Sequence, residues 1–99
     1  MKTISIFNRA GVFAENKDTA RDIRVNEIIP ELSGRGEVVL DFEKVEAATQ
    51  SFVHALISDV IRKFGSGALE RISFKSCSPV VKKMIGIVVD YMQEGLGPK

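Results

Sequence analysis

The sequence predicts an α/β fold, a single small β-α-β-α-β-α domain with a mostly parallel sheet. Three segments have the apolar or alternating pattern of short strands, at about residues 3–8, 37–42 and 69–76. Each is followed by a segment with helical spacing, at about residues 16–29, 49–64 and 79–94. Because helices of this length carry the chain back across a sheet, we expect strands that run in the same direction, joined by right-handed crossovers.

The composition indicates one globular domain, which we place at residues 1–94, with a flexible tail at residues 95–99. Apolar residues make up 44% and charged residues 27% of the chain, and the net charge is +1. Without a basic stripe or a long apolar run, we expect neither a nucleic-acid nor a membrane partner. The first residues lack a signal-peptide pattern and Cys77 is the single cysteine, so we expect a cytoplasmic protein without disulfides.

The first strand is indicated by Ile4 and Ile6, which alternate with polar residues up to the break at residues 8–11. The helix after it has Asn16 or Asp18 as its cap, and Pro30 ends or kinks it because proline lacks a backbone N–H. Its expected buried stripe has helical spacing and consists of Val25, Ile28, Ile29 and Leu32.

The second strand, residues 37–42, is nearly continuous in apolar character, which is typical of a central strand. The following helix has an apolar half made of Phe52, Val53, Leu56, Ile57, Val60, Ile61 and Phe64. Its polar half consists of Ser51, His54, Ser58, Asp59 and Arg62. Glycines at residues 65 and 67 end this helix.

The third strand has Ile72 and Phe74 alternating with polar residues, and Ser78-Pro79 is a strong start for the last helix. That helix is apolar around about two-thirds of its circumference. One sheet face rarely needs so much apolar surface. Two explanations stay open: core packing alone, or a contact with a partner or a second copy of the chain.

The junction after the second strand carries the clearest chemistry. Asp41 ends the strand, and a turn of small residues leads to Ser51 in the first turn of a helix. A serine there either caps the helix or holds a phosphate next to the positive helix end. Asp41 is expected to accept backbone N–H groups of the following loop. In the loop after the first strand, exposed Val12 and Phe13 indicate a contact patch.

Catalysis is not indicated. Ser51 and His54 share a helix face, but Asp59 lies about 80° or more away around the helix axis. The sequence shows no other residue that would orient the histidine. The acidic pair of a receiver domain is missing after the first strand, where Asn8 and Arg9 stand, and no phosphate-binding glycine motif occurs. We therefore expect no enzyme, no metal and no cofactor. Cys77 precedes a helix start and is either an inert small residue or a reactive thiol.

The succession Val39-Leu40-Asp41-Phe42-x-x-Val45, the small-residue turn and Ser51-Phe52 together resemble the bacterial STAS-like domains, mostly of unassigned function. These are compact relatives of the STAS domains of anti-sigma-factor antagonists. The likeness extends over about residues 19–92. In the antagonists a partner kinase of the histidine-kinase-like ATPase type phosphorylates the serine that Ser51 matches. Thr49 stands where they have an acid and Phe52 where they have a glycine, and the extra N-terminal strand is lacking.

The resemblance implies a non-enzymatic signalling or adaptor domain that binds a protein partner, an ATPase-type anti-sigma or sensor kinase, with Ser51 as the phosphorylation candidate. The expected partner-binding residues surround this serine: Asp41, Thr49, Gln50, Ser51, Phe52, His54 and Ser58. The alternative is a homo-oligomeric module, such as a homodimer, that pairs through the apolar C-terminal helix.

Overall fold

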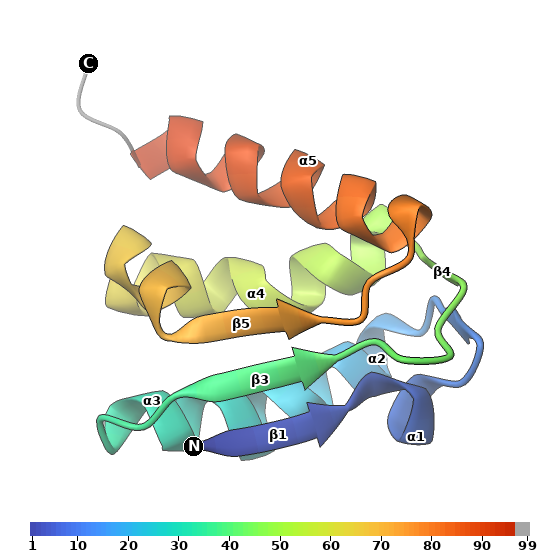
Figure 1. Ribbon diagram of the computed structural model, residues 1–99. Helices are drawn as coiled ribbons and strands as arrows, with labels where there is room; N and C mark the ends of the chain where they lie inside the picture. Colours follow the sequence, from blue (N-terminus) through green and yellow to red (C-terminus); the bar gives the residue numbers. More distant parts are fainter. Residues whose placement is uncertain (97–99) are drawn as a thin grey trace.

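A computed structural model describes residues 1–96 and shows a three-stranded parallel sheet in the order β1 (Lys2–Ser5), β3 (Val38–Asp41), β5 (Ile72–Lys75) (Figure 1). Val39 lies opposite Thr3 on one side and Ser73 on the other, so β3 is the central strand. The predicted α/β class and the parallel sheet are confirmed.

The long helices gather on one face of this sheet (Figure 1). The faint ribbons of α2 (Lys17–Ile23), α3 (Ile29–Ser33) and α4 (Gln50–Phe64) lie behind the strands, and α5 (Pro79–Leu96) packs along α4. Four strand residues are buried toward the helices: Ile4, Val38, Leu40 and Ile72. The alternate positions form a mostly polar face without a helix, and Thr3, Ser73 and Lys75 are exposed there.

The first strand is shorter than the sequence pattern predicts. The chain enters a short helix, α1 (Ile6–Ala10), because the Ser5 hydroxyl oxygen accepts the Asn8 N–H at 3.2 Å and caps it. Ile6 is therefore a buried residue of helix α1 and not of the strand. Two further short strands lie in the loops after α1 and after β3. They are β2 (Phe13–Ala14) and β4 (Ala47–Ala48), which pair in parallel, a contact that the sequence did not predict.

The predicted buried stripe of the first long helix is wrong at Val25, which is 47% exposed, and Ile29 is only partly buried. The helix does not end at Pro30 but continues to Ser33 through a π-helical turn, η1 (Arg24–Ile28). Pro30 has no N–H to donate to the Asn26 carbonyl, and the Ile29 N–H bonds to the Arg24 carbonyl rather than to the Val25 carbonyl that a regular helix would use. The buried isoleucines Ile23, just before this turn, and Ile28, its last residue, are accordingly five residues apart.

The third strand also begins later than predicted, because a 3₁₀ helix, η2 (Ser66–Glu70), occupies residues assigned to its start. Gly65 ends α4 with φ +79°, in the region that favours glycine. The last helix starts at Pro79 as predicted and extends to Leu96, two residues past the expected end. The rest of the expected tail, residues 97–99, lies outside the described residues.

No helix within residues 1–96 combines the length and the apolar character that crossing a membrane requires.

Candidate functional site

The start of α4 is held in place by the two loops that follow β1 and β3. Asp41 Oδ1 accepts the Glu43 N–H at 2.9 Å, the role in the following loop that its position predicted. The Thr49 N–H donates to the Ala14 carbonyl at 3.0 Å, and the Thr49 hydroxyl oxygen accepts the Phe52 N–H at 3.0 Å. Thr49 is therefore the cap of α4, and the β2–β4 pairing sets its position.

Ser51 is not the cap but the second residue of the helix, and it is exposed to solvent. The backbone N–H groups of Gln50 and Ser51 have no hydrogen-bond partner among residues 1–96. These two donors lie at the positive end of a 15-residue helix. The structure thus places a water-accessible hydroxyl next to free backbone donors, an environment that would stabilise a phosphate.

Two of the expected contact residues cannot touch a partner. Phe52 is 0% exposed and Ser58 is 3% exposed. Phe52 belongs to the apolar half of α4, which packs on the sheet. Ser58 lies on the predicted polar half, but α2 and α5 flank α4 on both sides, and Ser58 is the residue of that half that is buried. The expectation that Phe52 and Ser58 contact a partner is therefore corrected, because both side chains lie in the interior.

A shallow pocket of about 340 Å³ adjoins Ser51 and is lined by Lys17, Gln50, Ser51, His54 and Ala55. His54 packs near Tyr91 of α5, with ring centroids 6.4 Å apart. No hydrogen bond joins Ser51 and His54 in the described part of the chain, and Asp59 is ion-paired with Arg24 and Arg62. The Ser–His arrangement therefore has no third group to orient it.

Phe13 belongs to the contact patch expected in the loop after the first strand, and the structure places it next to this site. The side chain is 61% exposed, and Val12 beside it is also exposed. The pairing of β2 with β4 places Phe13 opposite Ala47, two residues before Thr49. Phe13 and Thr49 line one small pocket of about 80 Å³. The expected contact patch and the start of α4 thus form one continuous surface.

Cys77 lies at the same edge of the sheet, in the loop between β5 and α5. Partial burial raises the pKa of its thiol above the ordinary value of 9.0. Lys82 acts in the opposite direction, and Asp41 raises the pKa further. The thiol is therefore mainly protonated at neutral pH and matches the inert alternative. Within the described residues, no group of three His, Cys, Asp or Glu side chains could hold a metal ion.

Ser78 links this loop to the one before α4. Its hydroxyl donates to the Glu46 carbonyl at 3.0 Å, while its oxygen accepts the Val81 N–H at 3.2 Å and caps α5. The cap predicted from Ser78-Pro79 is confirmed. The bond from Ser78 to the Glu46 carbonyl ties the start of α5 to the loop that leads into α4.

Comparison with known proteins agrees with the resemblance in the sequence. The model of one protein family, described as a STAS-like domain of unknown function (DUF4325), matches residues 25–82, which is more than half of the chain. The match includes β3, the turn after it and all of α4. No curated protein and no solved structure matches. The chain belongs to the family of STAS-like domains of unknown function.

Proposed function

We propose that this domain is a non-enzymatic signalling or adaptor module that binds a protein partner through the start of α4 and the loop that contains Phe13. One observation carries the proposal: an exposed hydroxyl, Ser51, lies beside free backbone donors, and the exposed Phe13 shares a pocket with Thr49, the cap of the same helix. Aromatic residues that fill a pocket on a partner contribute disproportionately to binding. We assign this anchoring role to Phe13, because Phe52, the aromatic among the expected partner-binding residues, is buried.

The partner that the family relationship suggests is an ATPase-type kinase, and Ser51 is the proposed acceptor. In that step the Ser51 oxygen bonds to the γ-phosphorus of ATP, ADP leaves, and the hydroxyl proton is released. The product carries up to two more negative charges at the N-terminal end of α4. The positive end of the helix tolerates this charge. The interface with the partner does not, because the site that buried a neutral hydroxyl would now have to bury a phosphate without a charged partner. Phosphorylation would therefore release the partner.

Affinity capture from the source cell with intact-mass measurement tests both parts. We expect the wild-type chain to retain one ATPase-type protein, and Phe13→Ser and Ser51→Asp to retain at least tenfold less, about 1.4 kcal/mol of binding free energy. Ile87→Ser is the control, because Ile87 is an exposed apolar residue on the outer face of α5 and does not line the pocket at Ser51. Equal capture by all four chains would overturn the proposal, and a mass increase of one phosphate would identify the modified state.

A second candidate function is a homodimer through α5, and the outer face of that helix favours it. Its inner face is buried and contains Val81, Ile85, Val88 and Met92. Its outer face still exposes Val80, Ile87 and Tyr91, which are separated by seven and four residues and so share a stripe. Lys83 lies near the start of this stripe and Asp90 near its end. An antiparallel second copy would bring these opposite charges together.

Light scattering of the intact protein tests this alternative. We expect the mass of a dimer, and the mass of a monomer after Ile87→Lys or Tyr91→Lys. Val25→Lys serves as control, because Val25 is similarly exposed but lies on the opposite side of α4. A monomeric wild-type chain at high protein concentration would exclude the homodimer.

A further inference from the structure

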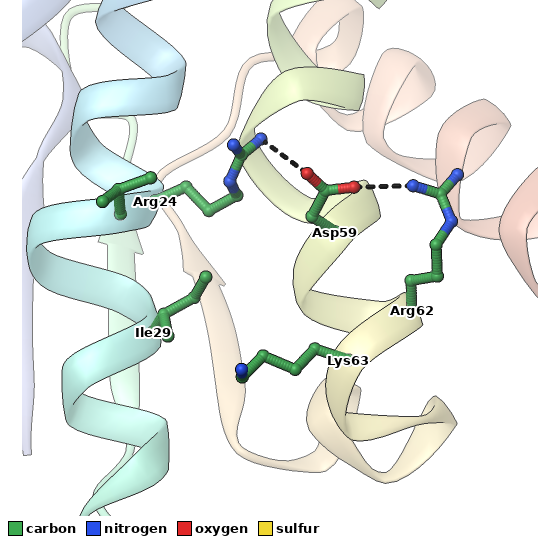
Figure 2. Close-up of a pocket in the computed structure, with 6 residues that line it drawn as sticks. Arg24, Ile29, Asp59, Arg62 and Lys63 are labelled. Carbon is green, nitrogen blue, oxygen red and sulfur yellow. Dashed lines mark hydrogen bonds and ion pairs between the residues drawn. The ribbon is translucent and has the colours of Figure 1, made fainter.

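A second pocket lies between the π-helical turn and the C-terminal half of α4 (Figure 2). Its volume is about 330 Å³, and it is lined by Arg24, Val25, Ile29, Asp59, Arg62 and Lys63. It is separate from the surface at Ser51, because Ser51 and Asp59 are eight residues apart, about 12 Å along the helix.

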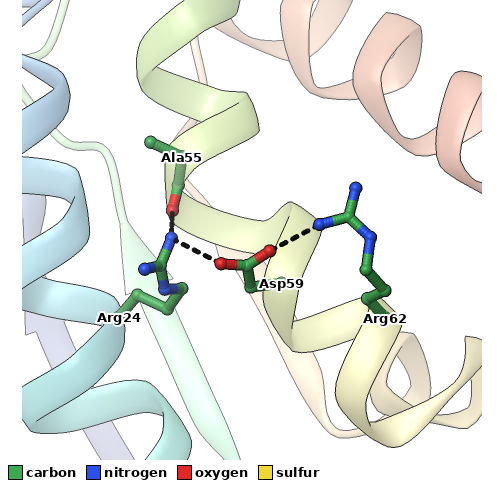
Figure 3. Close-up of polar contacts among 4 residues, drawn as sticks. All are labelled: Arg24, Ala55, Asp59 and Arg62. Atoms are coloured by element: carbon green, nitrogen blue, oxygen red, sulfur yellow. Dashed lines mark hydrogen bonds and ion pairs between the residues drawn. The ribbon is translucent and has the colours of Figure 1, made fainter.

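The polar side of this pocket is an ordered network (Figure 3). Arg24 Nη1 donates to the Ala55 carbonyl at 2.7 Å and lies 3.3 Å from Asp59 Oδ2. Arg62 Nη1 donates to Asp59 Oδ1 at 2.6 Å. Each oxygen of the carboxylate thus faces one guanidinium. Three cations and one anion line the pocket, which leaves an excess of two positive charges, and the ion pairs hold Arg24, Asp59 and Arg62 in place.

The apolar side of the pocket is a consequence of the π-helical turn. Val25 is 47% exposed and Ile29 is half-buried, although the helical spacing of the sequence would place both in the core. Three of the six lining residues, Arg24, Val25 and Ile29, come from the turn and its end. Such turns occur frequently at functional sites, because the widened backbone redirects side chains at a cost in helix stability. Here it moves a valine from the interior to a cationic surface.

We propose that this pocket binds an acidic segment of a protein partner, in which an apolar side chain contacts Val25 and Ile29 while flanking carboxylates pair with Arg62 and Lys63. The positive charge of the pocket favours acidic residues in the bound segment, and the exposed Val25 side chain favours an apolar residue between them. A membrane surface fits less well, because polybasic lipid sites gather about four to eight cations and carry no carboxylate among them. This interaction is additional to the one proposed at Ser51.

Amide NMR of the full chain tests the pocket with a defined probe, a ten-residue peptide of glutamates flanking two central leucines. We expect shifts at the lining residues and saturable binding. Lys63→Glu should weaken it about tenfold, since it replaces attraction by repulsion. Val25→Ser should weaken it about threefold and Val25→Leu should preserve it. Lys75→Glu is the matched charge control, because Lys75 is exposed on the open sheet face.

Three results would overturn the proposal. The first is the absence of shifts at the pocket, and the second is an equal loss of affinity in Lys63→Glu and Lys75→Glu. The third is an equal response to inorganic phosphate or to vesicles with 30% phosphatidylglycerol, which would assign the site to anions in general or to lipids. Ser51→Asp should leave peptide affinity unchanged, so a failure here is distinguishable from a failure of the switch at Ser51.

Discussion

Two helical segments cover the same face of the sheet, but they obey the sequence pattern differently. In α4 the buried residues recur at regular helical spacing, and the apolar half expected from the sequence lies in the core. In the segment from α2 to α3, the spacing of five between Ile23 and Ile28 replaces the regular period. The difference teaches that side-chain periodicity predicts burial only while the backbone hydrogen-bond pattern is constant. Where that pattern changes, an apolar residue leaves the core and becomes a surface feature.

The largest expected effect concerns the regular helix. Phe52→Ala should lower the free energy of unfolding by about 3–5 kcal/mol, because it removes a completely buried aromatic ring from the first turn of α4. Urea denaturation followed by circular dichroism measures this loss. Phe13→Ala, at an exposed aromatic on the neighbouring loop, should stay within about 0.5 kcal/mol. A small effect of Phe52→Ala would mean that the ring is a surface contact after all.

The next prediction compares how two apolar residues of the π-helical turn contribute to the free energy of unfolding. Ile28→Ala should cost about 2–5 kcal/mol, since Ile28 is fully buried. Val25→Ala should cost no more than about 0.5 kcal/mol, because Val25 is already in contact with water. The same denaturation measurement applies to both. Equal losses would show a regular helix with the stripe that the sequence pattern predicts.

The fold was predictable from sequence because its elements rest on local patterns. Strand alternation, the Ser78-Pro79 start and the apolar half of α4 all depend on neighbours within a few residues. The departures are also local, but the apolar alternation of the strands does not show them. Ser5 caps α1 three residues before Asn8 and so shortens β1, and a 3₁₀ helix displaces the start of β5. The π-helical turn is signalled by Pro30 together with the spacing of five between isoleucines.

The site was predictable to a smaller extent. The sequence placed Ser51 in the first turn of a helix and Asp41 as a support for the loop, because strand end, turn and helix start follow each other within twelve residues. It could not place Phe13 beside Thr49, because the β2–β4 pair joins residues more than thirty positions apart. It also misplaced Ser58, since one helical wheel does not show that α4 has a neighbouring helix on each side.

A smaller effect distinguishes the two hydroxyls at the start of α4. Thr49→Ala should cost about 1 kcal/mol, because it leaves the Phe52 N–H without its acceptor. Ser51→Ala should change stability by less than about 0.5 kcal/mol, since its hydroxyl is exposed and makes no hydrogen bond within residues 1–96. Thermal unfolding of the two variants side by side measures the difference. The reverse order would make Ser51 the cap and remove its hydroxyl from any partner.

The smallest expected effect concerns the charge at Ser51 itself. Ser51→Asp should stabilise the domain by about 0.3–1 kcal/mol at low salt, because a negative charge at the second position of α4 complements the positive helix end. Ser51→Lys should shift stability by a similar amount in the opposite direction, and 1 M NaCl should reduce both shifts by screening. Urea titrations at the two salt concentrations measure them. Stabilisation of the folded domain together with loss of the partner would show that the charge acts on the interface, whereas destabilisation by the aspartate would attribute lost binding to a damaged fold.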